Sequence, residues 1–136
     1  MQTKEISIVK DFIAAIKQVD VSQLSKLMTE DHTFIDSQGT IDNNREHMMK
    51  GWKEYFHMFP DYKIEIQSIL QDGSLVAAFG FASGTYNGKR GLVAENRIEM
   101  PAAWKAKVEN GKIKVWQVYA DWTKGYKIIN EDKESS

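Results

Sequence analysis

The segment between residues 101 and 122 constrains the fold more than any other part of the chain. It holds two long strand-like stretches joined by Asn110-Gly111, a dipeptide that favours a two-residue β-hairpin turn because both positions accept a positive φ. Four bulky aromatic residues lie along these stretches: Trp104, Trp116, Tyr119 and Trp122. Aromatic walls with few polar groups are typical of a small-molecule pocket, and the same side chains would also suit a core or a dimer interface.

The composition predicts one ordinary globular domain. The 136 residues are enough to bury a core, and 42% of them are hydrophobic. The formal net charge of −1 gives no electrostatic reason to expect nucleic acid or an anionic membrane as a partner. The sequence has no cysteine, which excludes disulfides and thiolate chemistry. Because the first residues resemble neither a signal peptide nor a membrane span, we expect a cytoplasmic protein.

Helical periodicity dominates the first part of the sequence. Apolar residues share one face of a helix predicted over residues 3–18: Ile6, Val9, Ile13 and Ile16. Asp20 is a suitable cap for a short second helix. A third helix is predicted over residues 44–59, with Asn43 in capping-box spacing before it and Pro60 ending it. The apolar stripe of this helix contains Met48, Trp52, Tyr55, Phe56 and Phe59.

The remaining sequence has the pattern of strands. They are predicted over residues 32–36, 62–71, 75–86, 97–109 and 112–126. Gly80 and Gly84 within one strand indicate bends. This order predicts an α+β fold, in which three N-terminal helices pack on a strongly curved, mostly antiparallel sheet and form a cone with an interior pocket. We expect a single domain over residues 1–130 and a flexible polar tail over residues 131–136.

Several short motifs follow one another along the chain. They are His32-Thr-Phe-Ile-Asp36, Gly39, Phe59-Pro60-Asp61, Gly84-Thr85, Gly111-Lys112-Ile113 and Tyr119-Ala120-Asp121. Together with the order of elements, these motifs resemble the nuclear transport factor 2-like superfamily, in particular its SnoaL-like branch, over about residues 4–129. This superfamily includes ketosteroid isomerases, polyketide cyclases, epoxide hydrolases and non-catalytic transport factors. The resemblance therefore implies a fold more firmly than an activity.

The resemblance implies two candidate carboxylates. Asp36 falls where ketosteroid isomerases keep their general base, and Asp121 matches the aspartate that SnoaL-like cyclases use at the end of the last strand. The oxyanion hole of the isomerases is not matched, since Ala103 stands at the position of its aspartate. Val118 stands at the position of the last-strand carboxylate of the epoxide hydrolases. Steroid isomerisation and epoxide hydrolysis are therefore disfavoured.

Strand geometry leaves alternatives open for these residues. His32 and Asp36 share one face of the first predicted strand but lie about 13 Å apart, too far for a direct hydrogen bond unless a bulge intervenes. Asp36 would serve as a base inside the cone, or it would cap the turn at residues 37–39 with its own side chain. His32 is a catalytic candidate or a structural histidine. Asp121 shares a face with Trp116 only if a bulge intervenes.

We therefore expect a pocket for a small hydrophobic molecule. The candidate catalytic residues are Asp36, Asp121 and His32, and the candidate substrate-binding residues are Trp52, Tyr55, Phe79, Phe81, Trp104, Trp116 and Tyr119. Resemblance to SnoaL-like proteins implies a cofactor-free isomerase or cyclase that acts on a small hydrophobic carbonyl compound by carboxylate acid/base catalysis. The alternative is a non-catalytic protein that binds a small hydrophobic ligand.

The expected partners follow from the same features. The three histidines show no metal-ligand spacing and no phosphate-binding loop is present, so we expect neither a metal nor a cofactor. The final strands are rich in apolar residues on both faces. An exposed sheet of that kind would be an unusually apolar surface, so we expect a homodimer that buries sheet against sheet.

Overall fold

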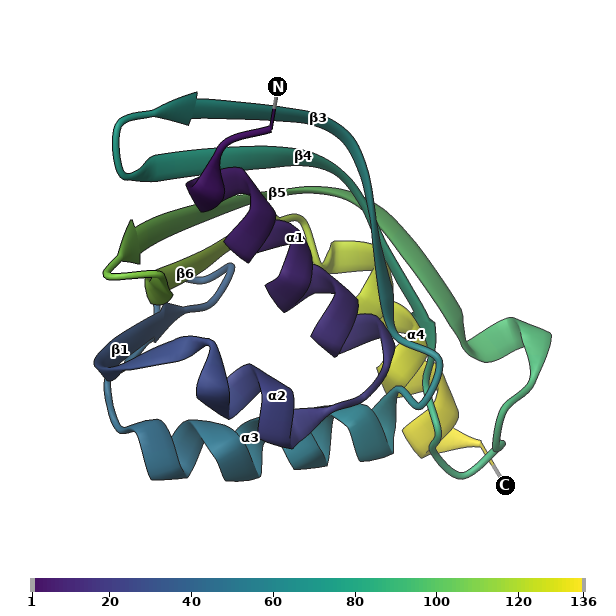
Figure 1. The fold of residues 1–136 in the computed structure, drawn as a ribbon. Helices are drawn as coiled ribbons and strands as arrows, with labels where there is room; N and C mark the ends of the chain where they lie inside the picture. Colours follow the sequence, from purple (N-terminus) through teal and green to yellow (C-terminus); the bar gives the residue numbers. More distant parts are fainter. Residues whose placement is uncertain (1, 136) are drawn as a thin grey trace.

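The computed structural model, which describes residues 2–135, is a curled six-stranded sheet with helices on its concave side and at one end (Figure 1). The elements in chain order are α1 (Lys4–Lys17), α2 (Val21–Lys26), β1 (Met28–Ile35), β2 (Ile41–Asp42), α3 (Arg45–Met58), β3 (Lys63–Asp72), β4 (Leu75–Thr85), η1 (Ala94–Asn96), β5 (Arg97–Glu109), β6 (Lys112–Ala120) and α4 (Thr123–Glu134). None of the helices in the described part has the length and apolarity needed to cross a membrane.

The sheet is mixed and does not close. Its strand order is β2-β1-β6-β5-β4-β3. All neighbours are antiparallel except β1 and β6, which run parallel. The predicted α+β class is confirmed. The prediction of three N-terminal helices is inexact, because β1 and β2 come before α3 and a fourth helix follows the last strand.

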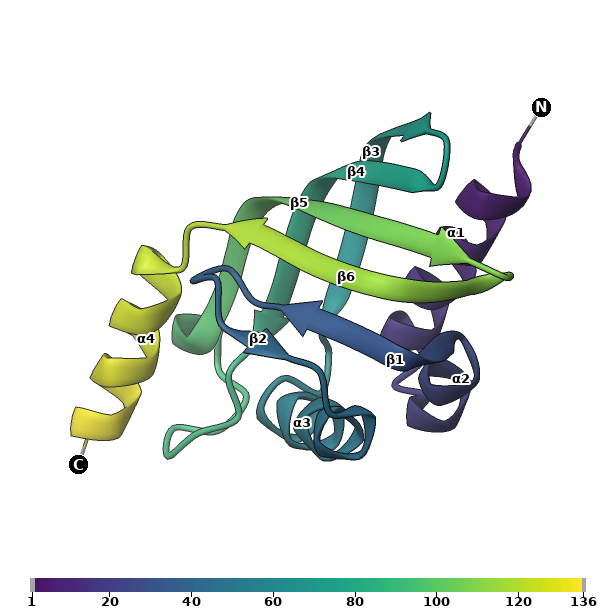
Figure 2. The same cartoon turned by 90° about the vertical axis from the view of Figure 1, so that its left-hand side faces the viewer.

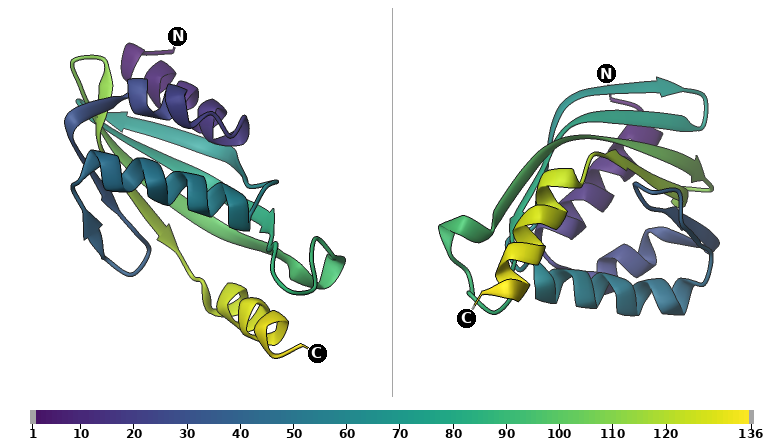
Figure 3. Two further views of the ribbon diagram at one scale, coloured as in Figure 1. Left: turned by 90° about the horizontal axis from the view of Figure 1, so that it is seen from below. Right: turned by 180° about the vertical axis from the view of Figure 1, so that it is seen from behind.

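Helices α1, α2 and α3 lie on the concave side of the sheet (Figure 3). Each begins at a polar cap and buries apolar side chains. Asp20 Oδ1 accepts a hydrogen bond from the Gln23 N–H at 3.0 Å, as the sequence predicts. Helix α3 is capped by Asn44, whose Oδ1 accepts from the His47 N–H at 2.9 Å, so the prediction of Asn43 was wrong by one residue. The predicted apolar stripe of α3 faces the sheet, with Met48, Trp52, Phe56 and Phe59 all buried.

The strands of the sheet are strongly curved (Figure 2), and the pairing register shifts in three places, one of them between β1 and β6 and two with a single extra residue. The register between β3 and β4 shifts between Ile66 and Ser68, opposite Gly80. A Cβ at Gly80 would lie 1.8 Å from the Glu65 carbonyl oxygen, so only glycine permits this approach of the two strands. The bend predicted at Gly80 therefore coincides with a bulge. The second bulge lies in β6, where Lys114 is an extra residue in the pairing with β5.

The hairpin at residues 110 and 111 is confirmed, but the strand after it is shorter than predicted. Asn110 and Gly111 have φ values of 52° and 75°. Strand β6 ends at Ala120, because Asp121 Oδ1 accepts from both the N–H and the hydroxyl of Thr123, at 2.9 and 2.6 Å, where the chain turns into α4. Helix α4 continues through Glu134, so the tail boundary predicted at residue 131 falls inside a helix.

A buried polar network anchors α4. The side chain of Asp132, only 1% exposed, accepts hydrogen bonds from the N–H groups of Lys89 and Arg90 at 2.7 and 2.8 Å and from Asn96 Nδ2 at 2.9 Å. Burial alone would raise the pKa of Asp132, but these hydrogen bonds outweigh it and hold the pKa below its usual value of 3.8. The loop before η1 is therefore attached to α4.

Replacing Asp132 should loosen α4. In Asp132→Asn, one carbonyl oxygen and an amide donor would face three converging donors, so we expect faster hydrogen exchange along α4 than along β5. Because the native pKa is lowered, the stabilisation by the ionised carboxylate is present above the unfolded pKa and is lost as the pH falls through the native one. The difference in Tm between the two proteins should therefore shrink below about pH 4. The exposed neighbour Glu131→Gln is the control, and equal α4 exchange in all three proteins would contradict the anchoring role.

Candidate functional site

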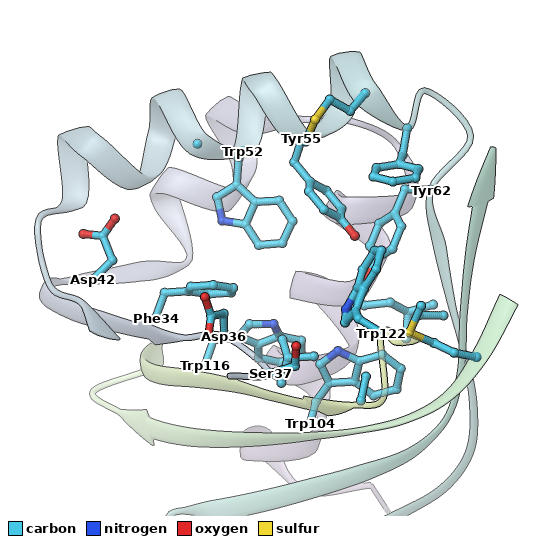
Figure 4. Close-up of a pocket in the computed structure, with 18 of the residues that line it drawn as sticks. Phe34, Asp36, Ser37, Asp42, Trp52, Tyr55, Tyr62, Trp104, Trp116 and Trp122 are labelled. Carbon is cyan, nitrogen blue, oxygen red and sulfur yellow. The ribbon is translucent and has the colours of Figure 1, made fainter. Parts of the chain in front are cut away.

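A cavity of about 390 Å³ lies between α3 and the concave face of the sheet (Figure 4). All four tryptophans of the chain line it: Trp52, Trp104, Trp116 and Trp122. Five other aromatic residues complete much of the wall: Phe34, Tyr55, Phe59, Tyr62 and Tyr126. This volume and this lining suit a small organic molecule with flat apolar surfaces.

Strand alternation and the β6 bulge direct the tryptophans into the cavity. In β5 the side chains of Ile98, Met100 and Trp104 alternate toward the helices and are buried. In β6 the extra residue Lys114 lets both Ile113 and Trp116 face inward, at 0% and 1% exposure. Alternation then continues without a further bulge to the end of β6, so Trp116 and Asp121 lie on opposite faces.

Helix α4 closes one side of the cavity, which the sequence analysis did not predict. Trp122, Tyr126 and Ile129 line the cavity at helical spacing. Gly125 makes this arrangement possible, because a Cβ there would lie 2.6 Å from Cε3 of Trp122. The Tyr126 hydroxyl accepts a hydrogen bond from Gln38 Nε2 at 2.5 Å, which joins α4 to the loop after β1.

Asp36 is the one predicted catalytic residue that lies in the cavity wall. It is half-buried, and its carboxylate is turned toward the interior (Figure 4). Oδ1 accepts hydrogen bonds from the N–H groups of Gln38 and Thr40, both at 2.9 Å, so the predicted turn-capping role is present as well. No hydrogen bond from residues 2–135 reaches Oδ2, which leaves this oxygen available to a molecule in the cavity.

The other two predicted catalytic residues lie outside the cavity. His32 is fully buried in the core, where its Nδ1 lies 2.7 Å from the Ile113 carbonyl oxygen and its ring packs against Phe12. Asp121 is exposed, and its carboxylate is occupied by Thr123 at the start of α4. Neither geometry supports the catalytic role expected for these residues.

The predicted substrate-binding residues divide between the two faces of the sheet. Trp52, Tyr55, Trp104 and Trp116 line the cavity. Phe79 and Tyr119 point to the convex face and are 43% and 48% exposed. Phe81 shares that face with Phe79 by strand alternation. Both alternating sets of side chains in β4 are largely apolar, so the sequence pattern could not show which face of the strand points inward.

The charged and polar groups of the wall are few. Burial raises the pKa of Tyr62 to about 12 and that of Tyr55 well above 10, and the neighbouring Tyr62 raises the pKa of Tyr55 further. Both phenols are therefore neutral donors. Asp42 lies at the rim, where its Oδ2 is 2.5 Å from His47 Nδ1. No lysine, arginine or histidine among residues 2–135 lines the cavity, and no cluster of three potential metal ligands occurs in this range.

Comparisons with known proteins agree with this architecture. A protein-family model described as the SnoaL-like domain matches residues 9–116, and no curated protein matches the sequence. A provisionally named SnoaL-like polyketide cyclase from Shewanella denitrificans has a TM-score of 0.79 at 16% identity, covering 99% of this chain and 100% of that one. An LEH-like epoxide hydrolase from M. tuberculosis has a TM-score of 0.77 at 15% identity, covering 96% and 92%. At these identities the similarity is one of fold.

The core histidine predicts a pH dependence of stability. Burial lowers the pKa of His32 below its usual value of 6.5, and the charge of Arg45 also lowers it. The hydrogen bond to the Ile113 carbonyl and the charge of Asp31 raise the pKa, but they do not offset burial. Below pH 6.5 the imidazole of His32 is protonated in the unfolded chain but not in the folded chain. The free energy of unfolding should therefore decrease as the pH is lowered from about 7.5 to 5.5.

Denaturant unfolding across this pH range tests the assignment. In His32→Gln, the side-chain amide can still donate to the Ile113 carbonyl but does not titrate, so the pH dependence should flatten. His57→Gln, at an exposed position on α3, should keep the wild-type dependence. Identical slopes in the wild type and His32→Gln would show that another group is responsible.

Proposed function

Because the chain belongs to the SnoaL-like domain family, we propose that it binds a small hydrophobic carbonyl compound in its cavity and acts on it as a cofactor-free isomerase or cyclase. The observation that supports this most is the placement of Asp36. Its carboxylate is turned into an aromatic cavity, and one oxygen is held by two backbone N–H groups while the other has no partner within residues 2–135. A carboxylate positioned in this way suits a general base.

The chemistry that fits this site is proton transfer at a carbon next to a carbonyl group. Removing that proton places negative charge on the carbonyl oxygen, which a nearby donor must stabilise. The neutral Tyr55 hydroxyl lines the same cavity as Asp36 and can donate a hydrogen bond. Structures with this fold include proteins named as a polyketide cyclase and an epoxide hydrolase, so an enzyme is compatible with the fold.

A non-catalytic ligand-binding protein is the second candidate. The hydrogen bonds from Gln38 and Thr40 give Asp36 a structural role in the turn, which would account for the carboxylate without any reaction. The cavity would then bind a hydrophobic molecule through its aromatic walls alone. The two candidates differ in whether a bound carbonyl compound exchanges protons.

Proton exchange on a simple ketone separates the two candidates. We expect the protein to accelerate the loss of the ¹H NMR signals next to the carbonyl of 2-tetralone in D₂O. Asp36→Asn should reduce this acceleration by about 100-fold or more, the usual size of a general-base contribution. Asp121→Asn is the matched control, because that carboxylate lies outside the cavity, and should exchange like the wild type. Binding of 2-tetralone without accelerated exchange in the wild type would favour the non-catalytic candidate.

We also propose that two copies associate through the convex face of the sheet. In register across β4, β5 and β6, Phe79 lies beside Ala103 and Ala103 beside Tyr119, which makes the outward apolar surface continuous. Phe79 and Tyr119 are both more than 40% exposed in the single chain. A continuous apolar surface of this kind favours burial against a partner.

Sedimentation tests this association. The wild type should sediment as a dimer at micromolar concentration, and Phe79→Glu should shift it to a monomer while keeping its fold by circular dichroism. Leu92→Glu, an exposed leucine in the loop before η1, is the control and should stay dimeric. A wild-type monomer, or a Phe79→Glu dimer, would rule out association through this face.

A further inference from the structure

The charged groups of the cavity wall are all of one sign. Among residues 2–135, the charged side chains that line the cavity are Asp36 and Asp42, and no lysine, arginine or histidine of this range does so. An anionic ligand would lose its hydration in the cavity without gaining a positive partner, which is unfavourable. A positively charged ligand would gain a carboxylate. The wall therefore favours a cation over an anion of the same shape.

Asp36 is the carboxylate whose charge is available to a ligand. Both oxygens of Asp42 have partners, because Oδ1 accepts a hydrogen bond from the Asn44 N–H at 3.0 Å and Oδ2 lies 2.5 Å from His47 Nδ1. Asp36 Oδ1 accepts from two backbone N–H groups, and no hydrogen bond from residues 2–135 reaches Oδ2. No basic side chain in this range forms an ion pair with Asp36. A ligand in the cavity can therefore supply the positive partner.

Aromatic side chains of the wall form a continuous series that ends on both sides of Asp36. Neighbouring rings in the series have centroids 5.1 to 6.3 Å apart. In the order of these contacts, the series consists of Phe34, Trp52, Tyr55, Phe59, Trp122 and Tyr126. Its first member lies two residues before Asp36, and the hydroxyl of its last member accepts a hydrogen bond from Gln38, two residues after Asp36. The carboxylate therefore lies between the two ends of the series.

This arrangement suits a quaternary ammonium group. The faces of aromatic rings attract cations, and proteins bind quaternary ammonium ligands in cages of aromatic rings. Phe34, Tyr55 and Trp122 are half-buried and Tyr126 is 45% exposed, so part of their surface is accessible. Trp52 and Tyr55 extend from α3 toward the side of the cavity on which Asp36 lies (Figure 4). A quaternary ammonium group has no N–H, so it loses no donated hydrogen bond to water when it enters an apolar cavity.

We propose that the cavity selects carbonyl compounds that carry a quaternary ammonium group, which the aromatic series surrounds and whose charge Asp36 balances. This inference rests on the proposed function and names the substrate class of the same site. Attachment of the ammonium group to the reacting carbon makes the two roles of Asp36 compatible. The positive charge then draws that carbon toward the carboxylate and makes its C–H more acidic, because it stabilises the negative charge that develops when the proton is removed.

Two ketones of one shape test the proposal. They are phenacyltrimethylammonium and phenyl neopentyl ketone, in which a tert-butyl group replaces the trimethylammonium group, and their affinities are measured by isothermal titration calorimetry. A cavity that recognises only apolar surface would bind the neutral ketone more tightly, because no charge has to leave water. We expect the wild type to bind the ammonium ketone at least as tightly as the neutral one. Weaker binding of the ammonium ketone would overturn this inference alone, and binding of neither ketone would overturn the proposed function itself.

Three variants test which groups bind the cation. Asp36→Asn keeps an oxygen for the turn but removes the charge, so it should weaken the ammonium ketone by about tenfold and leave the neutral ketone within about twofold. Phe34→Leu keeps an apolar side chain without a ring, so it should weaken the ammonium ketone by about threefold to tenfold. Glu54→Gln removes an exposed charge of α3 outside the cavity and is the control, with both affinities unchanged. Equal losses for both ketones in Asp36→Asn, or equal losses in Asp36→Asn and Glu54→Gln, would contradict the cation site.

A measurement on the wild type decides if a variant does not fold. The N-methyl protons of phenacyltrimethylammonium should move upfield in the ¹H NMR spectrum on binding, because the ring currents of the surrounding aromatic side chains shield protons above their faces. N-methyl signals that stay in place at saturation would contradict the enclosure of the ammonium group by the aromatic series.

Discussion

The bulge opposite Gly80 is the constraint on which the site depends, because a flat sheet would leave no room between itself and α3. One extra residue in β3 bends the strands, and the absence of a side chain at Gly80 lets the Glu65 carbonyl come close to β4. The sheet then curls around the helices instead of packing flat against them (Figure 1). Large aromatic side chains line the remaining space without filling it, and they leave a cavity of about 390 Å³.

A second constraint acts at the other end of the molecule. Helix α4 and its N-cap residue supply Trp122, Tyr126 and Ile129 to the cavity wall, yet the anchor of the helix is Asp132, which hydrogen-bonds to the loop before η1. The side chains that bind a ligand and the side chain that holds their helix in place are therefore different. This separation permits the wall to be largely apolar, because the buried carboxylate that anchors α4 lies outside the cavity wall.

The sequence predicted those parts of the fold that depend on local patterns. Asn110-Gly111 identified the hairpin, and the stripe of α3 identified Trp52 and Tyr55 as facing the sheet. The site was predicted less well, since a bulge at one residue such as Lys114 changes which face a strand presents. Trp122 continues the apolar alternation of β6 in the sequence, so the strand predicted over residues 112–126 extended past the true start of α4. The hydrogen-bond partners of Asp132 lie 36 to 43 residues away in the sequence, so the composition of the last segment indicated only a polar tail.

The most direct test of the site is the NMR spectrum of the four tryptophan indole N–H groups, all of which line the cavity. Each signal can be assigned from its absence in the corresponding tryptophan-to-phenylalanine variant. If the cavity binds a small hydrophobic carbonyl compound, saturating 2-acetylnaphthalene should shift these indole signals, because its rings would pack against the aromatic wall. Four indole signals that stay in place at saturation would contradict the central claim.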